Sequence, residues 1–104
     1  MGIHHVLVAG VNCADGYDRL NEYAPFPIDY PPLKKTSARG GLGKVYLEDL
    51  IETVVPEVEK TYPIESKHRM MMGSSMGGII SLYAGFEYPD IFPRVASVSG
   101  AYYV

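Results

Sequence analysis

The chain has 104 residues, of which 47% are hydrophobic, 20% charged and 12% aromatic, as is typical of one globular domain. Its 9 Lys and Arg residues are scattered and outnumbered by 12 Asp and Glu residues, which argues against nucleic-acid binding. No apolar run approaches the ~20 residues of a membrane helix, and no secretion signal is recognisable. The single cysteine, Cys13, excludes an internal disulfide. We therefore expect a cytoplasmic protein that does not bind membranes.

The first predicted element is a strand over Ile3–Gly10. This segment is nearly continuously apolar and ends in glycine, a pattern typical of a strand buried on both faces of a parallel sheet, although helix is not excluded. Residues 11–43 lack periodicity and are rich in proline and glycine, which predicts a long surface loop able to line a site.

One part of this loop, residues 40–44, has the sequence Gly-Gly-Leu-Gly-Lys and faintly resembles a phosphate-binding loop. It departs from that motif, because Ala38 stands at the position of the first glycine and Val45 at that of the Ser or Thr. A flexible lead-in to the next helix is the favoured interpretation.

The remaining elements alternate between helix and strand. Apolar residues at three- and four-residue spacing predict a helix over Lys44–Tyr62, in which Pro56 removes one hydrogen bond and bends the last turns. A strand over Arg69–Gly73, a helix over Met76–Tyr88 and a strand over Val95–Ser99 follow. The order predicts one α/β domain over residues 1–104, with three mainly parallel strands and crossover helices.

The segment that carries chemistry lies between the second strand and the second helix. Residues 73–78 read Gly-Ser-Ser-Met-Gly-Gly and contain the G-x-S-x-G pattern of a nucleophile elbow, with Ser75 at its centre. Such a turn strains the serine backbone and crowds its neighbours, so glycine is expected at Gly73 and Gly77. The Met76 amide, at the start of the next helix, is the expected backbone oxyanion donor. The alternative is a glycine-rich turn without catalytic meaning.

Three segments together resemble one family of α/β hydrolases. Gly73–Ala84, Tyr88–Phe92 and Val95–Ser99 are similar to the putative-esterase (esterase D-like, enterochelin esterase-like) family, and Arg19–Pro25 resembles its segment after the fourth strand. The resemblance implies a partial α/β-hydrolase fold, the central part of the family domain. It also implies a serine hydrolase of carboxylic esters or thioesters that uses no cofactor and no metal.

The partners that Ser75 needs are not evident. In this fold the acid and the histidine follow the serine, but only Glu87 and Asp90 are acidic after Ser75 and no histidine follows it. His68 precedes the strand that leads to Ser75, which places it ~20 Å away. We therefore expect an incomplete site, with a non-catalytic remnant or interaction domain, self-associating through exposed sheet edges, as the alternative.

The remaining candidates are aromatic. Tyr23 and Tyr102 lie near the carboxyl ends of predicted strands, where α/β proteins bind ligands, and could line a pocket for a small ester or thioester. An exposed tyrosine needs no such role, so both interpretations stay open at this stage.

Overall fold

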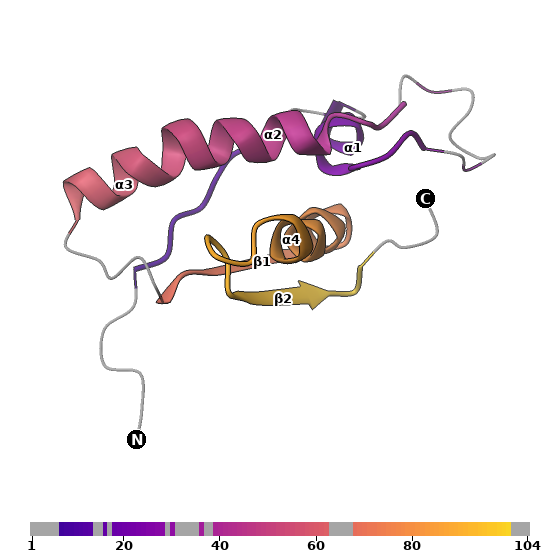
Figure 1. Ribbon diagram of the computed structural model, residues 1–104. Coiled ribbons are helices and arrows are strands. Elements are labelled where there is room, and N and C mark those ends of the chain that lie inside the picture. Colours follow the sequence, from indigo (N-terminus) through magenta and orange to yellow (C-terminus); the bar gives the residue numbers. More distant parts are fainter. Residues whose placement is uncertain are drawn as a thin grey trace.

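The computed structural model describes residues 7–13, 16, 18–28, 30, 36, 39–62 and 68–100. A continuous helical rod lies on one side of helix α4, and two strands lie on its other side (Figure 1). The elements in chain order are α1 (Asp18–Tyr23), α2 (Gly43–Asp49), the π-helical segment η2 (Leu50–Val54), α3 (Val55–Thr61), β1 (Met70–Ser74), α4 (Met76–Glu87) and β2 (Arg94–Val98).

The rod made of α2, η2 and α3 corresponds to the predicted helix over Lys44–Tyr62. Its apolar stripe is buried as expected, with Leu47 and Leu50 packed against α4 residues Ile80 and Ala84 in the main core. Pro56 has no N–H to donate to the carbonyl one turn earlier. The preceding segment, η2, is a π-helix, and the rod stays continuous through it (Figure 1).

The sheet of the described residues has two parallel strands. β1 and β2 pair in register from Met70 with Arg94 to Ser74 with Val98, and α4 connects them. This confirms two of the three predicted strands and is compatible with a partial α/β fold.

The third predicted strand, Ile3–Gly10, is not shown. Residues 3–6 lie outside the described residues, and Leu7–Gly10 has no strand structure. Leu7 is 43% and Val8 84% exposed, so this part is not buried as predicted. Among the described residues, no strand pairs with this segment. A strand without a hydrogen-bonded neighbour has no ladder to join, which explains the difference.

One further detail of the sequence interpretation changes. The predicted loop of residues 11–43 contains the helix α1, whose 6 residues are too few to display helical periodicity. The methionines of β1 do not all fill the core, because Met71 packs against it while Met70 and Met72 are 56% and 66% exposed. Among the helices that the structure describes, none has the length and apolar character needed to cross a bilayer.

Candidate active site

Ser75 occupies the turn between β1 and α4. It follows the last residue of the strand and precedes the first residue of the helix, with φ of 56° and ψ of −117°. Its N–H donates to the Val98 carbonyl at 3.0 Å, and its carbonyl accepts the N–H groups of Gly78 at 3.0 Å and Ile79 at 3.3 Å. A positive φ is uncommon outside glycine. The strained serine is therefore held by β2 on one side and by α4 on the other.

The three glycines around Ser75 differ in how much space each position has for a side chain. A Cβ added to Gly73 would lie 2.3 Å from the carbonyl oxygen of Gly77, so the strand and the helix meet there without room for a side chain. A Cβ added to Gly77 would meet nothing within 4 Å, so the crowding predicted at Gly77 is absent. The crowded position is instead Gly78, where an added Cβ would lie 2.7 Å from Ser97 Oγ. The reason is that Gly78 faces β2, whereas Gly77 faces open space.

The start of α4 presents backbone donors beside Ser75. The first N–H groups of a helix have no carbonyl one turn earlier, and the helix dipole makes this end positive. The amides of Gly78 and Ile79 are used by the Ser75 carbonyl. The Met76 amide precedes them, and the Met76 side chain, 3% exposed, anchors this first turn in a small apolar cluster with Ala24.

Tyr23, a predicted pocket residue, lies at the end of α1 and packs against the cluster of Ala24 and Met76. Its ring also contacts Tyr46 edge to face, with 5.0 Å between the ring centroids. The structure therefore places Tyr23 beside the apolar cluster that contains Met76, with its ring packed against Tyr46. Tyr102, the other predicted pocket residue, lies outside the described residues.

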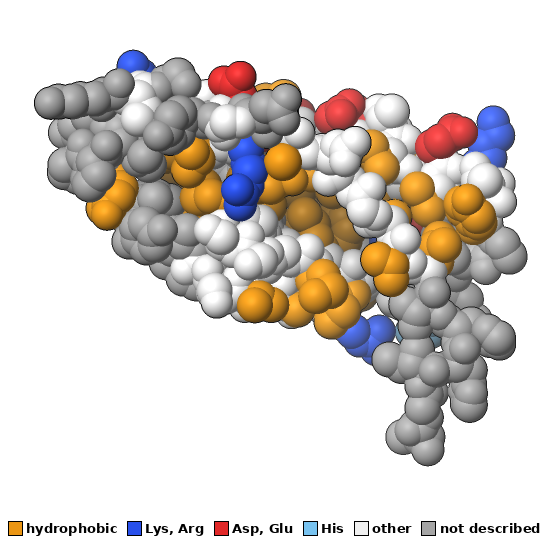
Figure 2. All heavy atoms as spheres, turned by 180° about the vertical axis from the view of Figure 1, so that it is seen from behind, with side chains coloured by type: hydrophobic (Ala, Val, Ile, Leu, Met, Phe, Trp, Pro, Cys, Tyr) orange, Lys and Arg blue, Asp and Glu red, His pale blue; other side chains and the backbone are white. Residues whose placement is uncertain are grey.

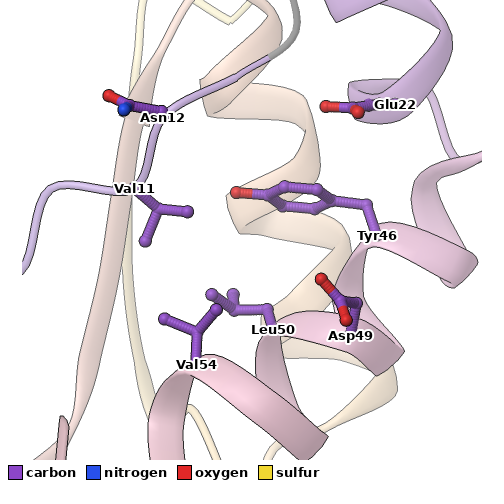
Figure 3. A pocket seen from close by; sticks show the side chains of 7 residues that line it. All are labelled: Val11, Asn12, Glu22, Tyr46, Asp49, Leu50 and Val54. Atoms are coloured by element: carbon purple, nitrogen blue, oxygen red, sulfur yellow. The ribbon is translucent and has the colours of Figure 1, made fainter. Parts of the chain in front are cut away.

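A hollow of about 150 Å³ lies elsewhere, between residues 11–12 and the rod (Figure 3). The Tyr46 hydroxyl points into it, with the carboxylates of Glu22 and Asp49 on either side of the ring (Figure 3). Ser75 is not among its lining residues, so this hollow is separate from the candidate nucleophile. It is lined by Val11, Asn12, Glu22, Tyr46, Asp49, Leu50 and Val54.

Tyr46 is held as a neutral phenol. Burial is the main cause that raises its pKa above the ordinary value, and a hydrogen bond to Tyr23 and the charge of Glu22 raise it further. The unfolded chain loses this proton near pH 10, whereas the folded chain keeps it. The contribution of the phenol to stability is thus complete below pH ~10 and is lost as the pH rises further.

We expect the Tyr46→Phe variant to remove this alkaline dependence. Above pH 10 the wild-type free energy of unfolding should fall by up to about 1.4 kcal/mol per pH unit from this one group. The slope for Tyr46→Phe should be shallower by that amount. Urea unfolding between pH 8 and pH 11 measures the difference, and parallel slopes for the two proteins would contradict it.

The structure does not bring the predicted acid and base candidates to Ser75. His68 is exposed and precedes β1, whereas Ser75 follows β1, so the strand separates them by roughly 20 Å. Glu87 ends α4, roughly 18 Å along the helix from its start, and Asp90 is exposed beyond it. His4 and His5 lie outside the described residues.

A parallel β1–α4–β2 unit with a strained serine in its first turn is compatible with a partial α/β fold. The sequence matches the family described as "Putative esterase" over residues 4–104, and the chain belongs to that family. The resemblance stated from the sequence is thus confirmed.

The curated proteins include one relative that supports the assignment without adding a function. The chain is 36% identical over 88 residues to "Uncharacterized protein YbbA" of Bacillus subtilis (strain 168). The aligned part covers 83% of this chain and 35% of that protein, so the chain spans about a third of the length of its relative. No solved structure matches the chain significantly.

Proposed function

We propose that this chain supplies the nucleophile of a serine hydrolase that cleaves carboxylic esters or thioesters. One observation carries the proposal, namely that Ser75 has φ of 56° in the turn between β1 and α4. A strained serine at the start of a helix presents its hydroxyl where the helix amides can stabilise negative charge. Because the chain belongs to the esterase family, we interpret this serine as the nucleophile.

In the proposed reaction, Ser75 Oγ attacks the carbonyl carbon of the substrate while a general base takes its proton. The Met76 amide donates to the oxyanion that forms, a contact worth roughly 3–4 kcal/mol. The C–O or C–S bond then breaks, the alcohol or thiol leaves with the proton, and water releases the acid from acyl-Ser75. A longer protein or a partner chain supplies the general base and the residue that orients it.

A fluorophosphonate probe tests the assignment of Ser75, because it reacts with an activated serine and requires no turnover. We expect Ser75 to be labelled in the longer protein or complex that supplies the general base, and not to be labelled there in the Ser75→Ala variant. Ser74→Ala is the matched control, since Ser74 is the adjacent serine at the end of β1 and should leave labelling intact. Equal labelling of wild type and Ser75→Ala, or an unlabelled wild type, would count against an activated Ser75.

A second candidate function is supported by the surface of the sheet. Met70, Met72 and Val98 share one face of the β1–β2 pair and are 50% to 66% exposed. Seen from behind, the molecule shows groups of exposed hydrophobic side chains (Figure 2). Parallel sheets are normally covered on both faces. A non-catalytic domain that associates with a second copy of itself would bury this face.

Sedimentation of the purified chain decides this alternative. Self-association should appear as a mass that rises with concentration, and Met72→Lys should return the protein to a monomer, since it places a charge on the shared face. A folded monomer at all concentrations would contradict the alternative.

A further inference from the structure

We propose that Asn21 is a positioning residue that fixes the returning end of the loop between α1 and α2 against the start of α4, and so shapes the substrate side of Ser75. This inference rests on the proposed function. It concerns residues 40–44, for which the sequence favours a flexible lead-in to the next helix.

Asn21 joins α1 to residues far along the chain. Its Oδ1 accepts two backbone hydrogen bonds, from the N–H of Arg39 at 2.5 Å and from that of Gly40 at 2.8 Å. Its main-chain carbonyl accepts a third, from Leu42 N–H at 3.0 Å. Asn21 thus accepts three hydrogen bonds from the returning end of the loop, two of them at its side chain.

Ala24, three residues after Asn21, also accepts hydrogen bonds from the returning end of the loop. Its carbonyl accepts the N–H groups of both Gly41 and Gly43 at 3.0 Å. The amides of residues 40–43, which a phosphate-binding loop would direct at an anion, are therefore committed to protein oxygens. These glycines form a hydrogen-bonded turn that leads into α2.

Glycine at position 40 is required by both space and conformation. Gly40 has φ of +74°, and a Cβ there would lie 2.7 Å from the Phe26 carbonyl oxygen and from Ile28 Cγ1. Ile28 N–H in turn donates to the Arg39 carbonyl at 2.7 Å. The outgoing and returning parts of the loop are thus locked together at its base, beside Asn21.

The base of the loop lies directly on the start of α4. Ala24 and Met76 form a buried cluster against which Ile28 packs. A Cβ added to Gly43 would lie 2.7 Å from Pro25 Cα and 3.0 Å from Ile80 Cδ1, so the loop touches the second turn of α4 as well. Because Met76 follows Ser75 in the chain, displacement of this base would move the surface beside the reactive hydroxyl.

Two variants separate the proposed role from simple packing. Asn21→Leu keeps the approximate volume and removes the acceptor, which leaves the amides of Arg39 and Gly40 without their partner. Asn21→Asp keeps an acceptor oxygen at the same place and should act as the rescue. Amide exchange by NMR reports on the loop and on Met76 and Gly77, and the probe rate at Ser75 is measured with short- and long-chain alkyl fluorophosphonates.

We expect exchange at Arg39 and Gly40 to accelerate at least about tenfold in Asn21→Leu, with smaller changes at Met76 and Gly77 and near-wild-type values in Asn21→Asp. The ratio of long-chain to short-chain probe rates should change in Asn21→Leu and recover in Asn21→Asp. Unchanged amide exchange at Arg39 and Gly40 would contradict the proposed positioning role of Asn21. Faster exchange with an unchanged ratio would reduce Asn21 to a structural role. If the wild type stays unlabelled in the longer protein or complex that supplies the general base, while its Met76 amide responds to Asn21→Leu, the proposed function is refuted and the positioning role of Asn21 stands.

Discussion

The Gly73→Ala variant should lose at least about 3 kcal/mol of its free energy of unfolding, the upper end of the usual range for overpacking. The added Cβ would lie 2.3 Å from the Gly77 carbonyl oxygen and 2.4 Å from the carbonyl carbon. Neither atom belongs to a flexible side chain, so relief requires β1 and α4 to move apart. That movement would open the packing of α4 on the sheet and displace Ser75.

The matched control is Gly77→Ala, two residues beyond the serine. Its Cβ would meet nothing within 4 Å, and alanine in a helix is favoured over glycine by up to about 1 kcal/mol. This variant should therefore be as stable as wild type or more stable. Urea unfolding of both proteins checks the contrast, and similar losses in the two variants would show that the motif needs both glycines for a reason other than space.

The elements near Ser75 could be predicted closely because their signals are local. The helix predicted over Met76–Tyr88 is observed over Met76–Glu87, and the strand predicted over Arg69–Gly73 is observed over Met70–Ser74. Each shows its periodicity or apolar run within its own residues. The turn between them follows from one glycine and one serine at fixed spacing.

Features that depend on distant residues could not be predicted. The apolar run that includes Leu7 and Val8 has strand character, but a strand forms only where another strand pairs with it. Asn21 lies 18 and 19 residues before the two amides that it binds, and nothing in the local sequence marks it as their acceptor. The different needs of Gly77 and Gly78 depend on which of them faces β2.

Replacement of Ser75 should separate reactivity from stability. Removal of a nucleophile costs an intact serine hydrolase about 10⁴–10⁶-fold in kcat. Ser75→Ala and Ser75→Gly should therefore both abolish probe labelling, whereas Ser74→Ala should retain it. Labelling rates with a fluorophosphonate measure this effect, and residual labelling of Ser75→Gly would place the reactive residue elsewhere.

The two unreactive variants should differ in stability. Alanine at position 75 keeps a Cβ at φ of 56° and retains the strain, whereas glycine adopts this conformation without it. Ser75→Gly should thus gain about 1 kcal/mol or more over Ser75→Ala in urea unfolding. A strained residue whose replacement stabilises the fold and eliminates its reactivity is one retained for chemistry. Equal stability of the two variants would mean that the surrounding backbone relaxes, and that the turn does not hold Ser75 under strain.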